Sequence, residues 1–289
     1  ENQNRQGVAL ATIKSFQVLT NNFSSEFGRG YGAVVLVQTK NGTNDLAGEL
    51  YGYAQDAQYN ELDVFNKGNA KPERYRRQYG LTAGFPIVRD TLFAFLHGDV
   101  VEDKGSGFIT RGVFTEADLA LPRLTNGNDT PANRAWQDSI IARWPRVTPN
   151  RPAIGPRAYA APVDSTFPTS DYSARVDYNL SANNNLTGRY QRSSQDLTPG
   201  EFIVGEVAVQ NHRQSNVGLT WTGILSSDTV QEGRYGLGLR STNVNIGDGN
   251  DTPVVRINDV GGGLFTILGN AGAFPITRNQ RDQQFVYNI

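Results

Sequence analysis

Residues Asp171–Leu180 read DYSARVDYNL, a stretch in which apolar and polar side chains alternate without a break. Successive side chains of a β-strand point to opposite faces, so this period of two predicts a strand with one apolar and one polar face. The turn-forming residues Ser181–Asn184 follow, and the alternation resumes from Asn185 to Gln191. The segment therefore predicts a β-hairpin.

The same pattern recurs along most of the chain after residue 45. A second hairpin is predicted around the turn Ser226–Asp228, and a less regular one around the break Val88–Asp90. The other alternating stretches are 46–55, 78–87, 92–101, 216–225, 235–240 and 283–289. The sequence therefore predicts an all-β chain with about eight antiparallel strands.

Long and short connections alternate between these strands. The long ones are predicted at 56–75, 103–170, 195–213 and 244–282, and the short ones at 88–90, 181–184 and 226–229. Outer-membrane barrels have short periplasmic turns and longer extracellular loops, whereas a soluble sandwich has no reason to keep every second connection short. Strands of this length match the ~9–11 residues that cross a bilayer at a tilt. The 12 Tyr, 14 Phe and 3 Trp can supply aromatic girdles at both interfaces.

Composition narrows the functional classes. The 27 Lys and Arg balance 28 Asp and Glu, which argues against a nucleic-acid-binding protein. Because the chain has no Cys, disulfides, zinc–thiolate sites and thiol nucleophiles are excluded. No stretch approaches the ~20 apolar residues of a membrane helix, and a mean hydropathy of −0.46 fits a soluble protein and a transmembrane β-barrel alike. The chain also lacks Met and ends in alternating sequence, so we expect an internal segment of a longer protein.

The first 45 residues follow a different pattern. Ile13–Leu19 is a short strand candidate, a Gly-rich stretch occupies Phe27–Gly32, and Ala33–Thr39 is nearly continuous in apolar residues. Such a run is typical of a strand buried on both faces. The pattern predicts a compact element that is separate from the membrane wall.

These residues carry a family resemblance. The stretch VLTNNFSSEFGRGYGAVVLVQTKNGTN, residues 18–44, resembles the end of the plug domain of TonB-dependent outer-membrane receptors, in their Oar-like branch. Residues 48–65, 77–95 and 177–190 resemble that branch's first barrel strand and later hairpins, in the family's order. The resemblance implies that 1–45 is the C-terminal part of a plug domain and 46–289 the N-terminal part of a transmembrane β-barrel with long extracellular loops. The barrel would be incomplete, because such transporters have ~22 strands.

The function implied by the resemblance is active import through the bacterial outer membrane. A siderophore, oligosaccharide or peptide-like ligand would bind the loops and the plug apex, and the TonB complex would pull on the plug through a segment upstream of this chain. The motif residues expected to hold or gate the plug are Glu26, Phe27, Gly28, Arg29, Gly30 and Gly32. Glycine permits close backbone approach there, and Glu26 and Arg29 are expected to form ion pairs with the lumen wall. Outer-membrane lipid and TonB are the expected partners, and the ligand and its binding residues stay open.

Little in the sequence favours catalysis or cofactor binding, and no enzyme activity, cofactor or metal is expected. Gly28–Gly32 lacks the G-x-G-x-x-G spacing of a dinucleotide loop and precedes a strand. His97 and His212 are the only histidines and are predicted on different elements, so neither a metal site nor a catalytic triad is expected. The near-repeats 126–131 and 247–253 favour ordinary Asx and Gly turns, with calcium loops as the alternative.

One helix is predicted, over Thr130–Trp144, with Thr130 as its cap and Pro131 in its first turn. Its apolar stripe is expected to pack the long loop against its neighbours, and ligand contact is the alternative. Two other functional classes remain beside transport. A barrel of the same fold could serve surface adhesion or assembly, and a soluble carbohydrate-binding β domain would share the alternation.

Overall fold

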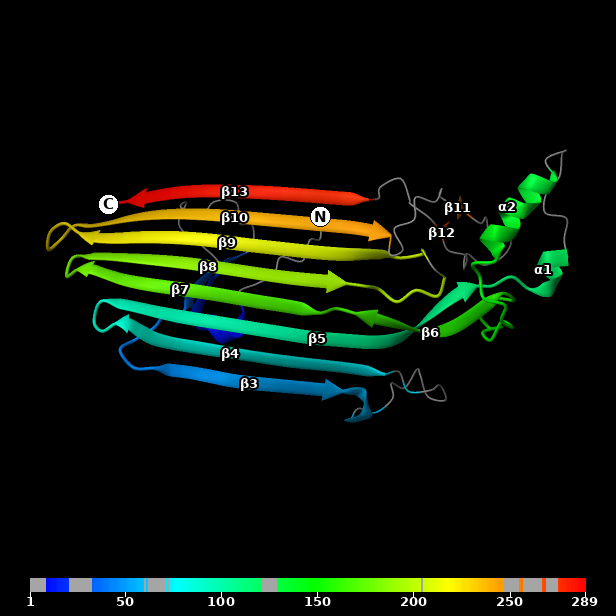
Figure 1. The fold of residues 1–289 in the computed structure, drawn as a ribbon, viewed down its shortest axis with the longest axis horizontal. Helices are drawn as coiled ribbons and strands as arrows, with labels where there is room; N and C mark the ends of the chain where they lie inside the picture. Colours follow the sequence, from blue (N-terminus) through cyan, green and yellow to red (C-terminus); the bar gives the residue numbers. More distant parts are fainter. Residues whose placement is uncertain are drawn as a thin grey trace.

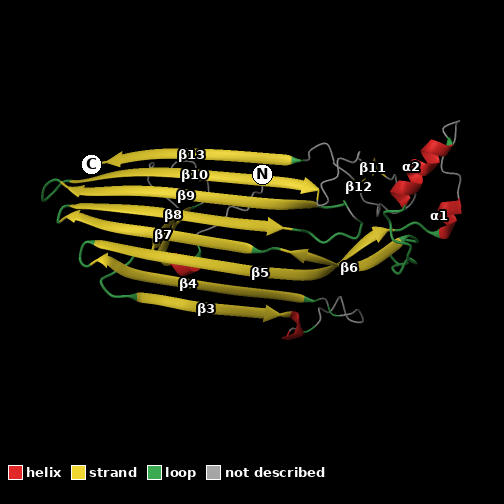
Figure 2. Cartoon of the chain, in the orientation of Figure 1, coloured by secondary structure: helices red, strands yellow, loops and turns green. Residues whose placement is uncertain are grey.

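In the computed structural model the chain forms one large antiparallel β-sheet (Figure 1, Figure 2). A small two-stranded sheet, made of β1 (Ile13–Leu19) and β2 (Val34–Thr39), is attached to one face of the large sheet at the end of β2, and the short strands β11 (Val255–Arg256) and β12 (Ile267–Leu268) form a separate pair. We call the face turned toward the small sheet the inner face and the opposite one the outer face. The structure describes residues 9–20, 33–59, 61, 71, 73–120, 129–203, 205–246, 255–256, 267–268 and 275–289.

The large sheet contains nine strands, and neighbours in the chain are mostly neighbours in the sheet. The strands are β3 (Ala47–Asp56), β4 (Arg74–Val88), β5 (Leu92–Gly112), β6 (Ala158–Thr166), β7 (Thr169–Ser181), β8 (Asn184–Leu197), β9 (Ala208–Ile224), β10 (Val230–Ile246) and β13 (Ile276–Asn288). Their order is β13-β10-β9-β8-β7-β5-β4-β3, with β6 paired to the outer part of β5. The hairpins predicted at Asp171–Gln191 and Asn216–Arg240 are confirmed, as are the single strand predicted at Leu46–Gln55 and the pair of strands around Val88–Asp90.

Strands β6 and β7 are two halves of one long strand. Both pair with β5, and the register continues from Lys104↔Thr166 to Val101↔Thr169 without a shift. The interruption falls at Phe167-Pro168, where proline has no N–H to donate to the ladder. Eight strands therefore run the length of the sheet, which agrees with the predicted number.

The long and short connections lie at opposite ends of the sheet (Figure 1). The short turns are 89–91, 182–183 and 225–229, as predicted. The long connections are shorter than predicted, because β5 continues to Gly112 and β9 begins at Ala208. Strands β5, β9 and β10 are 21, 17 and 17 residues long, well beyond what a bilayer requires.

The remaining elements are short. They are η1 (Leu10–Thr12), β1 (Ile13–Leu19), β2 (Val34–Thr39), η2 (Ala57–Tyr59), α1 (Glu116–Ala120), α2 (Pro131–Ile141), β11 (Val255–Arg256) and β12 (Ile267–Leu268). β1 and β2, both predicted as strands, pair with each other and with no strand of the large sheet. Among the described residues, none of the helices has the length and apolar character that crossing a membrane demands.

The prediction that the 33–39 run is buried on both faces is wrong. Val35 is 57% exposed and Leu36 37% exposed in β2. Within the described part of the chain, β1–β2 is a two-stranded ribbon that no further layer of structure covers. The apolar run therefore indicated the strand correctly but not its surroundings.

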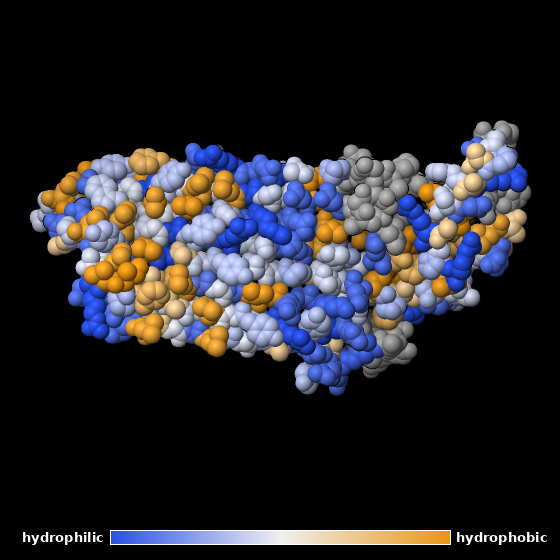
Figure 3. Space-filling view, in the orientation of Figure 1, coloured by the Kyte–Doolittle hydropathy of each residue, from blue (hydrophilic) through white to orange (hydrophobic). Residues whose placement is uncertain are grey.

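The large sheet places apolar side chains on the exposed side, in contrast to a soluble protein. Large apolar and aromatic side chains of the outer face are strongly exposed: Leu50, Leu81, Leu96, Tyr172, Val176, Tyr178, Leu180, Tyr190, Leu219, Leu239 and Phe285. Figure 3 shows apolar residues gathered over the half of the sheet nearer the short turns, with more polar residues toward the long connections. An exposed apolar band over part of the strands is the pattern of a lipid-facing barrel wall.

The inner face is polar and partly buried. Its most buried side chains include Thr82, His97, Asp99, Asp177, Ser193 and Thr242, all at most 8% exposed. On the outer face of β7, the apolar positions run from Tyr172 to Leu180, a span of nine residues, which matches the ~9–11 residues that cross a bilayer at a tilt. The longer parts of the strands therefore extend beyond the apolar band on the side of the long connections.

Candidate functional site on the inner face

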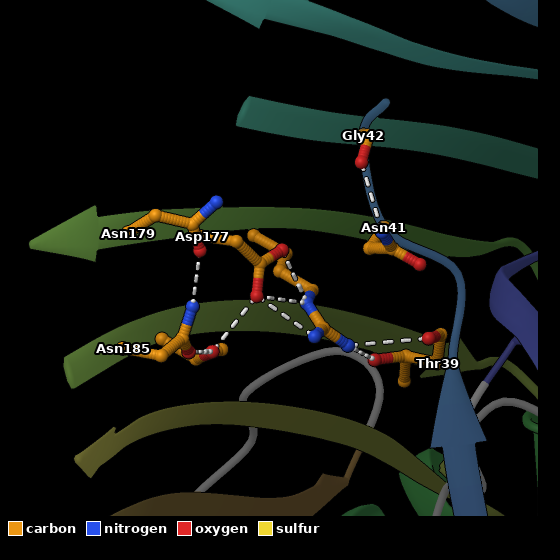
Figure 4. A network of polar contacts seen from close by, with 8 residues as sticks. Thr39, Asn41, Gly42, Asp177, Asn179 and Asn185 are labelled. Atoms are coloured by element: carbon orange, nitrogen blue, oxygen red, sulfur yellow. Dashed lines mark hydrogen bonds and ion pairs between the residues drawn. The ribbon is translucent and has the colours of Figure 1, made fainter. Parts of the chain in front are cut away.

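Arg175 links the small sheet to the wall. Its guanidinium Nη1 donates to Thr39 Oγ1 at 2.9 Å and to the Thr39 carbonyl at 3.2 Å, at the end of β2 (Figure 4). The same guanidinium binds Asp177 through Nε and Nη2, each at 2.8 Å, because residues two apart on a strand share a face. Thr187 on β8 donates to Asp177 Oδ1 at 2.8 Å. Arg175 on β7 thus holds the end of β2, and Asp177 and Thr187 hold Arg175 in place.

The segment that joins β2 to β3 lies directly on the sheet. A Cβ at Gly42 would stand 2.3 Å from the Ala94 carbonyl oxygen and 2.9 Å from that of Phe85, so only glycine fits against these two strands. Asn44 then pairs with the short turn after β4. Its Nδ2 donates to Asp90 Oδ1 at 2.5 Å, and the Asp90 N–H donates to Asn44 Oδ1 at 2.8 Å.

A second polar cluster lies on β3, β4 and β5. Tyr51 Oη donates to Asp99 Oδ2 at 2.8 Å, and Gln78 Nε2 donates to the same oxygen at 2.9 Å. The Tyr51 ring covers Gly80, where a Cβ would stand only 2.2 Å from the ring. Asp99 is directly opposite Asp171 on β7, so two carboxylates of the inner face are neighbours. Their alternation along the strands is visible in the sequence, but their pairing depends on the register.

A cavity of about 440 Å³ lies between the small sheet and the wall. Four cationic side chains line it, Lys40, Arg175, Arg189 and Arg234, and no Asp or Glu is among its described lining residues. Arg189 stands directly opposite Arg175 on the neighbouring strand. Gly218 on β9 stands opposite Arg189, and Gly236 on β10 stands opposite Gly218, so these residues form one row across the sheet. Because the two glycines have no side chains, they leave the floor of the cavity open.

At the end of the sheet opposite the short turns, side chains of the long connections pack against one another and form one module. Trp144 and Ile203, at 2% and 0% exposed, are the centre of a cluster with Phe114, Ile140 and Phe202. This cluster joins the end of the α2 segment to the connection between β8 and β9. The prediction that the helix packs its loop holds only at the end of the predicted helix, where Ile140 and Trp144 join this cluster, because α2 has no buried residue and Trp136 is 52% exposed. Thr130 caps the helix by accepting the Asn133 N–H at 3.2 Å.

Two ion pairs hold the same module. Arg157 donates to Asp118 Oδ2 through Nε at 2.9 Å and to Oδ1 through Nη2 at 2.5 Å. These bonds keep the pKa of the Asp118 carboxyl well below its usual range. Arg111 on β5 donates to Glu206, whose side chain is fully buried, at 2.9 Å.

The motif residues predicted to hold a plug lie outside the described residues. These are Glu26, Phe27, Gly28, Arg29, Gly30 and Gly32, and their ion pairs with the wall remain predictions. Most of the two candidate calcium loops, 126–131 and 247–253, also lies outside, and Asp129 in the first is paired with Arg134. His97 and His212 lie on β5 and β9, and the described residues contain no group of three His, Asp or Glu side chains that could hold a metal ion. Thr39, Arg175 and Arg189 were not predicted as site residues. The only signal for Arg175 and Arg189 was their place on the polar face of alternating strands, and Thr39, at the end of the apolar run 33–39, gave none.

Comparison with known families identifies the family of this chain. Residues 38–285 match the family model described as an outer membrane beta barrel domain, which covers most of the chain, from before β3 into the last strand of the large sheet, β13. Comparisons with curated proteins and with solved structures found no match. The match agrees with the exposed apolar outer face and the polar inner face, and it points to the bacterial outer membrane. The chain belongs to the outer membrane β-barrel domain family.

Proposed function

We propose that the chain is part of a TonB-dependent transporter that imports a ligand through a plugged barrel in the bacterial outer membrane. The observation that carries this proposal is the bond between the small sheet and the wall. Arg175 donates two hydrogen bonds to Thr39, so β1–β2 is fastened to the lumen-facing side of the sheet and is not a further wall strand. An element in that position obstructs the lumen.

The position of the small sheet agrees with the sequence resemblance. Residues 1–45 would be the last part of the plug, Lys40–Asp45 the connection to the barrel, and 46–289 the first part of the wall. The contacts of Gly42 with β4 and β5 and of Asn44 with Asp90 fix this connection to the wall near the short turns. Short turns face the periplasm in such barrels, which is where TonB acts.

Channel conductance tests whether β1–β2 closes the lumen. The full-length protein would be reconstituted in planar bilayers with and without residues 9–45. We expect the intact protein to conduct little and the deletion variant to form open channels. Equal conductance for both would contradict a plug.

Dependence on TonB tests the transport class. Uptake of ferric siderophore, oligosaccharide and peptide probes would be compared in cells with and without TonB, each with and without this protein. Uptake of one probe that needs both proteins supports import. A surface-adhesion barrel would support cell attachment equally in both strains and take up none of the probes. The third class, a soluble carbohydrate-binding domain, is not compatible with the outer-membrane family and the exposed apolar face.

A further inference from the structure

We propose that the cavity between the small sheet and the wall is an anion site, which takes the carboxylate or phosphate group of a ligand in the lumen. The first argument is the balance of charge around it. Arg175 is neutralised by Asp177, with Nε–Oδ2 and Nη2–Oδ1 distances of 2.8 Å, and Arg234 by Glu232 at 2.5 Å. Among the described residues, the charged groups of Arg189 and Lys40 have no hydrogen bond or ion pair, and both line the cavity.

The register makes this charge arrangement unfavourable without an anion. Arg189 and Arg175 are directly opposite on β8 and β7, and like charges in opposite positions of an antiparallel pair destabilise it. Asp177, the carboxylate that acts electrostatically on Arg189, already binds Arg175 and Thr187. An oxyanion bound at Arg189 would offset the excess positive charge of the cavity, to which Lys40 contributes. The guanidinium presents its N–H groups in a fork that matches a carboxylate or phosphate.

The floor of the cavity leaves space for such a group. The Arg189 guanidinium extends across Gly218, where a Cβ would stand 3.6 Å from Nη2 and 3.7 Å from Nε. At Gly236, the next position of the row, a Cβ would meet nothing within 4 Å. A volume of about 440 Å³ lies within the ~300–1,000 Å³ range of small-molecule sites. The site thus takes a small anionic ligand or the anionic end of a larger one.

Phosphate binding to the full-length protein in detergent tests the site, with inorganic phosphate as the probe in isothermal titration calorimetry. We expect saturable binding that Arg189→Gln weakens by about tenfold or more, because charge-assisted hydrogen bonds are lost. Arg189→Lys keeps the charge but not the fork and should have an intermediate effect. Arg192→Gln is the matched control, since Arg192 lies three residues further on the same strand and points to the outer face. It should leave binding unchanged.

A second variant separates a built site from general attraction of anions to a basic lumen. Gly236→Val leaves all four cations in place but fills the floor of the cavity, so it should abolish saturable binding. Heat modifiability on gels would show that each variant is folded. Absence of saturable binding by the intact protein, equal loss in Arg189→Gln and Arg192→Gln, or unchanged binding in Gly236→Val would each overturn the proposal. The assay needs neither TonB nor uptake, so its failure is distinct from failure of the transport proposal.

Discussion

Tyr51 and Tyr53 both lie on the inner face of β3, but among the described residues only the Tyr51 hydroxyl has a hydrogen-bond partner. Its hydroxyl donates to Asp99 at 2.8 Å, whereas Tyr53 is 62% exposed. A hydrogen bond to a charged group contributes about 1.5–3 kcal/mol. We expect Tyr51→Phe to lower the free energy of unfolding by that amount and Tyr53→Phe to change it little. Urea unfolding in lipid vesicles measures both, and equal effects would contradict a specific role for the Asp99 bond.

At Gly42 the chain lies so close to the backbone of the wall that no other residue fits. In Gly42→Ala the new methyl would overlap the Ala94 and Phe85 carbonyl oxygens, so the connection would have to move off the wall. Overpacking of this kind costs about 1–3 kcal/mol. The thermal midpoint of heat modifiability should fall for Gly42→Ala. Gly107→Ala serves as control because a Cβ there meets nothing within 4 Å. A midpoint equal to that of the control would show that the connection is not tightly placed.

At the scale of elements, the module of long connections depends on a carboxylate with a lowered pKa. The folded-state pKa of Asp118 lies below the unfolded value of about 3.9, so its bond to Arg157 stabilises the module at neutral pH. This contribution is lost as the pH falls below about 4 toward the lowered pKa. We expect the amides of residues 113–120 to be protected from hydrogen exchange at pH 7 and 5 and to lose protection progressively as the pH falls below about 4.

The matched variants are Asp118→Asn and Asp164→Asn. Asp118→Asn should reduce protection of the module already at pH 7. Asp164 pairs with Lys104 at 3.0 Å, but its side chain is 59% exposed, and exposed pairs contribute little. Its replacement should leave exchange unchanged. If Asp118→Asn matched the wild type at pH 7, the ion pair would not be what orders this module.

At the scale of the whole molecule, the assignment of faces can be tested on adjacent residues. Tyr190 is 43% exposed on the outer face of β8, and Gln191 points inward beside the Asp171 carboxylate. A lipid-facing Arg near the bilayer midplane costs about 2–4 kcal/mol, whereas lumen substitutions cost much less. We therefore expect Tyr190→Arg to impair folding into lipid vesicles and Gln191→Arg to be tolerated. The reverse result would mean that the faces are inverted.

The contrast between the lipid-facing and the inward face also explains which strands could be predicted from the sequence. Alternation located every strand from β3 to β10 except β6, which lies within the long connection predicted at 103–170, because each face of a membrane wall meets a different solvent. The alternation of apolar and polar residues ends where both faces of a strand are in water. The strands therefore continue in the structure beyond the residues at which the alternation stops. β5 accordingly extends to Gly112 although the predicted connection began at Asp103. The apolar run at 33–39 predicted a strand, but burial depends on what covers it.

The sequence by itself determined the β class, the hairpins, the two faces of the wall and the alternation of short and long connections. All of these follow from side-chain period and turn composition, which are local properties. Only the tertiary structure decided that Arg175 reaches Thr39, 136 residues away, that Asp99 meets Asp171, and that Arg189 and Lys40 share one cavity. Such meetings depend on strand register and on the path of the chain across the inner face. Neither is encoded in a period of two, because every inward polar residue fits that pattern equally well.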